Sequence, residues 1–446
     1  MVKEQMKQNR RRIDKCKQYA DSLIKFINQS PTSYQAVETI KNTLLEHNYL
    51  PYKPNQTTQL QTGDRYFYVK DDSAIIAFEI GVNPLSEGFK IFGAHTDSPA
   101  LRIKPHSISI KENVIRLNTE VYGGPILSTW FDRPLSLAGR VTIKGQEQFH
   151  PETRLIDFQK PILILPNVAI HMNREVNRGV EIKADQHLLP FIAICDQQDL
   201  NRNWFEQLIA EQLYLEPDHI LDYDLFLYDT TPGCIVGINQ DFISASRLDN
   251  LGMCFSGLNA MINLTPEHEF NGINVLLYTN NEEVGSLSKQ GARGMFQRDI
   301  LESICLNLGG TRQDFLNIFD HSVMISADQA HAVHPNYSEY ADPDHRPKIN
   351  GGPVIKLAAA LSYATDSKSA GFFIELCQAA DIPYQRFVNR SDLKGGSTIG
   401  SIVSAIMPLS TVDIGNAIWA MHSIRETGGV KDIYYLDQVL KLFFSI

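Results

Sequence analysis

Several apolar runs that have the character of β-strands lead directly into acidic or histidine residues in this sequence. The runs are KIFGAH, INVLLYTN, SVMISAD and AIMPLSTVDI, and segments with helical periodicity lie between them. Alternating strands and helices predict an α/β fold built on a mixed or parallel sheet. Because ligands bind beyond the carboxyl ends of strands in such sheets, polar residues from distant segments can meet at one edge.

A second pattern interrupts this alternation. After about residue 102, HSISIKENVIRLNTEVY and PLSLAGRVTIKG alternate apolar and polar residues, as half-buried antiparallel strands do. The 446 residues are too many for one ordinary core and sufficient for two domains. We therefore expect an α/β domain formed by residues 1–102 and 237–446, interrupted by a β-rich domain at residues 103–236.

Charge and hydropathy exclude several kinds of partner. The net charge is −10, which argues against a nucleic-acid backbone as the main partner. No run approaches the eighteen apolar residues of a membrane span, and the basic start of the chain has no apolar core behind it. That start is typical of an amphipathic helix. The six cysteines form no C-x-x-C pair, so reduced thiols in a cytoplasmic protein are the simplest interpretation.

The polar residues at the strand ends are of the types that bind zinc. Imidazole and carboxylate together suit Zn²⁺, with cobalt or manganese as substitutes. An open catalytic zinc usually takes three protein ligands, so a larger set fits two ions that share one carboxylate. The predicted metal ligands are His95, Asp249, Glu283, Asp328 and His422.

Two neighbouring residues suggest catalytic roles. Asp97 lies two residues beyond His95 and can accept the second ring N–H of that histidine, which fixes its tautomer. In the adjacent pair Glu282 and Glu283, one carboxylate can bind metal while the other acts as general base.

Each residue taken singly also has an ordinary structural explanation. A His-x-Asp sequence often forms a local hydrogen-bonded turn, and Asp249 alone would most often cap a helix. His331 and His334 are spaced by three, as in a zinc-binding helix face, but the adjacent proline favours pocket residues. The hypothesis of a metal site therefore depends on the conjunction of residues at several strand ends.

Several longer motifs of this sequence resemble those of a known family. GAHTDSPALRIKP, YGGPILSTWFDRPLSLAGRV, SRLDN, NNEEVGS, SADQAHAVHPNY, GGPVIK and AMHSIRE resemble the aspartyl aminopeptidase family of di-zinc exopeptidases, which includes vacuolar aminopeptidase I. The match runs from about Ala20 to near the C-terminus. The resemblance implies an α/β catalytic domain with an inserted β-rich dimerisation domain, peptide substrates, and a tetrahedral dodecamer built from dimers.

The resemblance also implies a role for each candidate residue. Two zinc ions would share Asp249, the first with His95 and Asp328 and the second with Glu283 and His422. Glu282 would be the general base and Asp97 the partner of His95. Lys356, Tyr363 and His331 match positions near the substrate. His171 in AIHMNRE matches a residue that the family lends to a neighbouring subunit's active site.

This chain departs from the family pattern at a few positions, namely Asn280, Gly395, Ser401 and the pair Tyr340-Ala341. These changes leave the proposed metal ligands intact and bear on substrate preference. We expect an aminopeptidase that prefers N-terminal Asp or Glu, with Lys356 as the cation for the acidic side chain. The alternatives are a related di-zinc carboxypeptidase or deacylase, and a non-catalytic assembly protein on the same scaffold.

Overall fold

The computed structural model describes residues 2–56, 58–195, 203–264, 269–393 and 395–446, with side chains from residue 12 onward. The chain divides into two compact units. The first comprises Met1–Asp97, Gly233–Met421 and Glu426–Ile446, and the second Ser98–Pro232 and His422–Arg425. The boundaries expected from the sequence lay a few residues later, and the return of His422–Arg425 to the second unit was not predicted.

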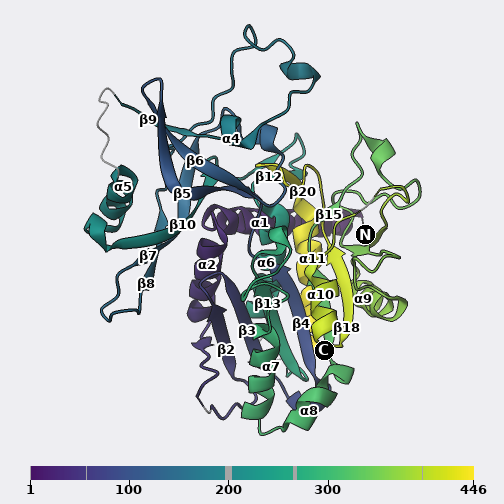
Figure 1. The fold of residues 1–446 in the computed structure, drawn as a ribbon. Coiled ribbons are helices and arrows are strands. Elements are labelled where there is room, and N and C mark those ends of the chain that lie inside the picture. The colour runs from purple at the N-terminus through teal and green to yellow at the C-terminus, as the bar shows by residue number, and fades with distance from the viewer. Residues whose placement is uncertain (1, 57, 196–202, 265–268, 394) are drawn as a thin grey trace. The chain divides into compact units, whose positions relative to one another are not determined.

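The first unit is built on a mixed sheet with the order β1-β2-β3-β13-β4-β14-β18-β16-β17 (Figure 1). The central strands β13, β4, β14 and β18 are parallel, whereas β3 and β16 are antiparallel to their neighbours β13 and β18. The strands are β1 Leu50–Pro51, β2 Arg65–Lys70, β3 Ala74–Ile80, β4 Phe89–His95, β13 Ile273–Thr279, β14 Val323–Ala327, β16 Val354–Lys356, β17 Gln385–Phe387 and β18 Ser410–Gly415.

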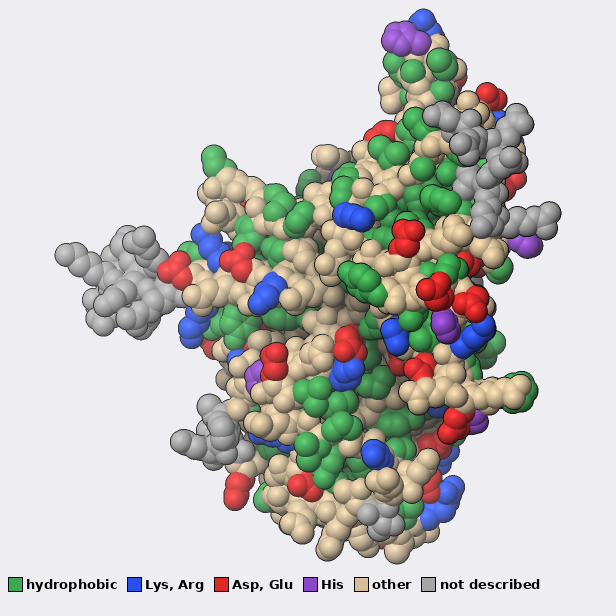
Figure 2. All heavy atoms as spheres, turned by 90° about the vertical axis from the view of Figure 1, so that its left-hand side faces the viewer, with side chains coloured by type: hydrophobic (Ala, Val, Ile, Leu, Met, Phe, Trp, Pro, Cys, Tyr) green, Lys and Arg blue, Asp and Glu red, His purple; other side chains and the backbone are tan. Residues whose placement is uncertain are grey.

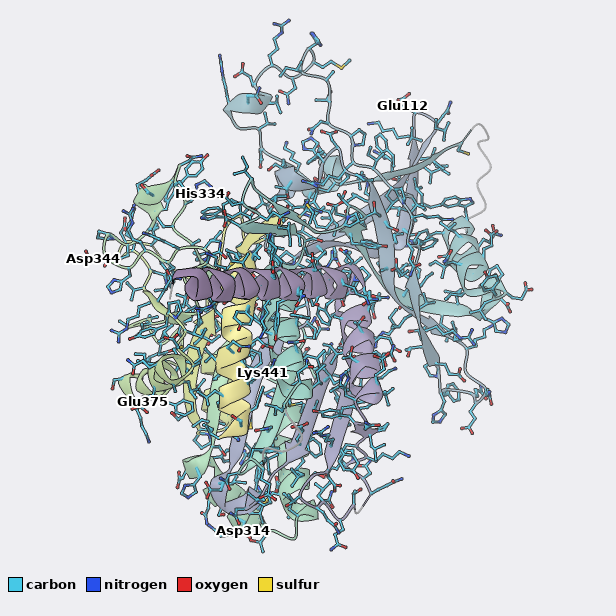
Figure 3. All side chains as sticks on the ribbon, turned by 180° about the vertical axis from the view of Figure 1, so that it is seen from behind. Glu112, Asp314, His334, Asp344, Glu375 and Lys441 are labelled. Atoms are coloured by element: carbon cyan, nitrogen blue, oxygen red, sulfur yellow. The ribbon has the colours of Figure 1, made fainter. Side chains whose placement is uncertain are left out.

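Helices cover both faces of this sheet, which explains why its central strands are apolar at nearly every position. In β13, Leu276 and Tyr278 face one core, and Val275 and Leu277 face the other. The first core includes residues of α1 Val2–Asn28, α2 Ser33–Glu46, α6 Leu248–Ile262, α9 Ser367–Ala379 and α11 Val430–Ser445. The second includes residues of α7 Phe296–Asn307, α8 Arg312–Asn317 and α10 Ile399–Ile406. Figure 3 shows the first face, with α1 against α6 and α11.

A glycine allows α6 to approach the sheet closely. A Cβ atom at Gly257 would lie 2.4 Å from a ring carbon of Phe92 and 2.5 Å from the hydroxyl of Tyr278. Any side chain there would push the helix away from the strands, because such distances lie well inside van der Waals contact. The first turn of α6 carries Asp249, so Gly257 contributes to the placement of a predicted metal ligand.

The second unit is an antiparallel sheet with the order β8-β7-β10-β5-β6-β9. Its strands are β5 Ala100–Lys111, β6 Val114–Tyr122, β7 Leu135–Ile143, β8 Glu152–Asp157, β9 Phe191–Ile194 and β10 Ile220–Asp229. One face packs on helix α5, Trp204–Leu213, through Phe205 and Ile209. The alternating apolar residues of this region therefore form a core of their own.

The described surface carries charges of both signs, and several cysteines are buried. On the face shown in Figure 2, Lys and Arg side chains are interspersed with Asp and Glu side chains over the described residues. Within the described ranges, no helix is long and apolar enough to cross a membrane. Cys16, Cys254, Cys305 and Cys377 are buried free thiols.

Candidate metal centre

The ends of three neighbouring parallel strands bring the predicted ligands of the first unit together. His95 ends β4 and is in register with Thr279 at the end of β13, so Glu282 and Glu283 follow immediately beside it. Asp328 follows the last residue of β14, on the other side of β4. The cluster therefore forms at the sheet edge where the sequence predicted it.

The cluster is compact, with His95 and Asp249 buried and with Asp328, Glu282 and Glu283 partly exposed. Nε2 of His95 lies 3.5 Å from Oδ1 of Asp249 and 3.7 Å from Oδ1 of Asp328. Ligand atoms of these three residues lie within 4.8 Å of one another, and the same holds for His95, Glu282 and Glu283. The side chain of His95 is 1% exposed. One imidazole nitrogen and several carboxylates at such distances form a donor set that suits zinc.

The electrostatics of the cluster favour a cation. Burial, followed by the charge of Asp249, raises the pKa of Glu283 well above its usual range. Burial and nearby carboxylates, Asp328 among them, raise the pKa of Glu282 to about 7. Burial alone would lower the pKa of His95, but hydrogen bonds to Asp249 and Asp328 raise it well above its usual value. Several carboxylates in a low-dielectric site repel one another, and a divalent cation neutralises that repulsion.

Asp97 connects His95 to the pair of glutamates. Its Oδ1 accepts the backbone N–H of Glu282 and its Oδ2 that of Glu283, both at 3.1 Å. Nδ1 of His95 lies 3.3 Å from Oδ1 of Asp97 and 3.1 Å from its carbonyl oxygen. The carboxylate of Asp97 thus holds both the loop after β13 and the ring of His95. The sequence predicted the contact with His95 but not the contacts with the loop.

The loop that carries the glutamates has a defined conformation of its own. Asn281 has φ of 61° and Gly285 has φ of 93°, so the short 3₁₀ turn Glu282–Val284 begins and ends in the left-handed region. Asn281 tolerates this conformation because its Oδ1 accepts hydrogen bonds from Ser288 and Gln290. Asn280, one of the departures from the family pattern, accepts the N–H of Asn281.

Asp249 is held by residues that the sequence did not single out. Its backbone N–H donates to Oε2 of the buried Glu426 at 2.9 Å, on β20 Glu426–Gly429. Nδ2 of Asn250 donates to the carbonyl of Ala327 at 2.8 Å, which ties the start of α6 to the end of β14. Both residues lie inside motifs noted above, SRLDN and AMHSIRE, and their position next to a predicted ligand was the available signal.

Lys356 lies against the cluster. Its Nζ donates to the carbonyl of Gln329 at 2.9 Å, lies 3.4 Å from Oδ2 of Asp328, and is 5.3 Å from the ring centre of Tyr363. Burial alone would lower the pKa of Lys356, but nearby anions, Asp328 first, raise it. Lys356 therefore keeps its positive charge and shares it with a predicted metal ligand.

His331 and His334 line a hollow of about 580 Å³ in the first unit rather than a zinc-binding helix face. His331 lies in β15, Ala330–His331, and its ring packs edge-on against Phe387. His334, labelled in Figure 3, packs against Tyr337 and Trp419. Other residues of the hollow are Tyr340, Ala341, Asp342, His345, Arg390 and Gly395.

The two remaining candidates belong to the second unit. His422 opens the segment His422–Arg425, and its Nδ1 lies 3.1 Å from the carbonyl oxygen of Gly124. His171 is exposed on the long connection between β8 and β9, beside Ile170 and Met172. Met172 is 81% exposed, and Val168 and Ile170 close by in the chain are exposed as well.

Comparisons with known proteins agree with the resemblance. Residues 26–444 match the M18 family, described as aminopeptidase I zinc metalloprotease. "Probable M18 family aminopeptidase 2" of Clostridium acetobutylicum is 49% identical over 96% of this chain and 99% of its own length. The protein of the same name from Clostridium novyi is 46% identical, with the same coverage of both chains.

Solved structures confirm the predicted α/β fold class. A chain of the complex of Ape4 and Nbr1 is 33% identical, with a TM-score of 0.93 over 97% of this chain and 86% of that chain. The mApe1 of Chaetomium thermophilum is 27% identical, with a TM-score of 0.84 over 96% of this chain and 98% of that chain. The chain therefore belongs to the M18 family of aminopeptidase I zinc metalloproteases.

Proposed function

We propose that this protein removes single residues from the N-termini of peptides with two zinc ions per chain. The observation that supports this most directly is the convergence of the buried His95 and Asp249 with the partly exposed Asp328, beside Glu282 and Glu283. His95 and Asp328 would bind the first ion, Glu283 and His422 the second, and Asp249 would bridge them. Cobalt or manganese would substitute for zinc in the same donor set.

Glu282 is the proposed general base. When bound, the two ions polarise the scissile carbonyl and lower the pKa of water toward neutrality. Glu282 takes the proton of the attacking water and later delivers it to the leaving amine. Its place is supported by Asp97, which holds the backbone of both glutamates. Burial already raises its pKa to about 7, and cations beside it would lower that value.

The proposed preference for N-terminal Asp or Glu depends on Lys356. Its ammonium group keeps its charge and lies at the edge of the cluster, near Tyr363. Because Asp328 already contacts Lys356, an acidic substrate would share this cation with a predicted metal ligand. Tyr340 and Ala341, where the chain departs from the family pattern, line the hollow beside His331 and can alter this preference.

The proposed assembly into a homo-oligomer is supported by exposed apolar residues in the second unit. The second unit exposes Val168, Ile170 and Met172 around His171, and exposed apolar residues that lie close together mark interaction surfaces. A solved structure with a similar fold is described as the S. cerevesiae mApe1 dodecamer, which is 24% identical to this chain. We propose a tetrahedral dodecamer built from dimers, in which His171 completes the substrate site of a neighbouring subunit.

The deciding experiment compares chromogenic substrates that carry N-terminal Asp, Glu or Leu, each with a free or an acetylated amine, in zinc, cobalt or manganese. The proposal predicts cleavage of the free amines only, with a higher kcat/KM for Asp than for Leu. Preferential cleavage of the acetylated substrates would point to a carboxypeptidase or deacylase. Absence of hydrolysis by the zinc-loaded protein would favour an assembly protein. A higher kcat/KM for Leu would overturn the acidic preference alone.

A further inference from the structure

The segment His422–Arg425 is anchored to the β-rich second unit along its length. The carbonyl of His422 accepts the N–H of Ile126 at 2.9 Å, and Nδ1 of its ring lies 3.1 Å from the carbonyl oxygen of Gly124. The N–H of Ile424 donates to Oγ1 of Thr129 at 3.0 Å. The β-rich unit therefore contacts both the backbone and the ring of this proposed ligand segment.

Arg425 contacts the last residues of the stretch Ser98–Pro232 of the second unit. Its guanidinium donates to the carbonyls of Thr231 at 2.8 Å and Pro232 at 3.0 Å. The carboxylate of Asp229, at the end of β10, lies 3.6 Å from Arg425 and 3.0 Å from Arg133. The side chain of Asp229 has no exposed surface, so two guanidinium groups compensate one buried charge.

The same network returns to Thr129. Nε of Arg133 donates to the carbonyl of Thr129 at 2.8 Å, and the hydroxyl of Thr129 donates to the carbonyl of Ile126 at 2.7 Å. Asp229, Arg133, Thr129 and the segment thus form one continuous set of contacts. Such a set can hold a conformation that the segment would not adopt by itself.

His422 has such a conformation. Its φ is 67°, in the left-handed region that a residue with a Cβ atom rarely occupies. Because the carbonyl of Gly124 only accepts hydrogen bonds, the contact at Nδ1 requires the proton on that nitrogen. In the neutral ring Nε2 then carries the lone pair, which is the form in which a histidine binds a metal through Nε2.

We propose that the β-rich unit orients His422 for metal binding, with Thr129, Asp229 and Arg425 as positioning residues for the second zinc ion. This inference rests on the proposed function, in which His422 is a metal ligand. It assigns to the inserted unit a role within its own chain, separate from assembly. Loss of a contact that orients a ligand typically weakens metal binding by about 10–100-fold.

The test measures zinc binding to the full-length protein across a series of chelator-buffered zinc concentrations, with bound ions per chain as the readout. Thr129→Val removes the hydroxyl at nearly constant shape, and Thr129→Ser retains it as the matched control. Thr129→Val is expected to weaken one of the two ions by roughly tenfold or more, while Thr129→Ser stays within about twofold of the unmodified protein. The other ion should bind with unchanged affinity in both variants.

Two further variants separate this inference from the proposed function. His422→Ala should lose the ion that Thr129→Val weakens, and Arg425→Met should weaken that same ion. If His422→Ala loses an ion while Thr129→Val and Arg425→Met bind both normally, the positioning role is wrong and the ligand assignment stands. If His422→Ala keeps both ions, the proposed ligand set fails, and the inference fails with it. Equal weakening of both ions by Thr129→Val would also overturn the inference. Should Arg425→Met not fold, the two Thr129 variants decide.

Discussion

Asp97→Asn tests how the candidate site is held together. The two oxygens of Asp97 accept one backbone N–H each, from Glu282 and Glu283. Asparagine retains one acceptor oxygen and turns its NH₂ group toward the second N–H, so one contact becomes repulsive and the other loses its charge. Hydrogen bonds to charged groups contribute about 1.5–3 kcal/mol each. A loss of about 2 kcal/mol corresponds to roughly 30-fold at 1.4 kcal/mol per factor of ten.

We therefore expect kcat/KM of Asp97→Asn to fall by roughly 10–100-fold at saturating zinc, with weaker zinc binding beside it. The assay is hydrolysis of a free-amine chromogenic substrate, together with chelator competition for zinc. Asp21→Asn, at an exposed position in the C-terminal third of α1, is the control for the same chemical change and should behave as the unmodified protein. If Asp97→Asn stays within about threefold of the unmodified protein in both measurements, the positioning argument is refuted.

Glu282→Gln should lower kcat by about 10²–10⁴-fold with zinc content unchanged, and a variant that kept most of its kcat would move the general base elsewhere. Gly257→Ala should destabilise the protein by about 1–3 kcal/mol, because the new Cβ would overlap Phe92, and an unchanged unfolding midpoint would contradict this packing. Subunit exchange between inactive His171→Ala and Glu282→Gln oligomers should restore activity at sites that combine Glu282 of one chain with His171 of its partner. If subunits exchange and no activity returns, His171 acts within its own chain or has no role in catalysis.

Much of the candidate site could be predicted because strand ends are readable in a sequence. The apolar runs before His95, Glu282 and Asp328 became β4, β13 and β14, and their parallel pairing brought the following residues to one sheet edge. Asp97 could be assigned to His95 because the two lie close in the chain. Local spacing and strand ends were sufficient for these residues.

Other parts of the site depend on contacts between segments that lie far apart in the chain. The hydrogen bond from Asp249 to Glu426 joins residues 177 positions apart, and periodicity contains no signal for it. The approach of Lys356 to Asp328 depends on the position of β16 in the sheet order, beyond β18. The assignment of His422–Arg425 to the second unit could not be predicted for the same reason. This segment lies in sequence between two stretches of the first unit, but it is held by residues such as Thr129 that lie far away in the chain.

The most direct test of the central claim is an anomalous-scattering map at the zinc absorption edge from crystals of the zinc-loaded protein. The account predicts two peaks per chain that share Asp249 as a ligand, one also bound by His95 and Asp328 and the other by Glu283 and His422. A single peak, or two peaks without a shared Asp249, would contradict it.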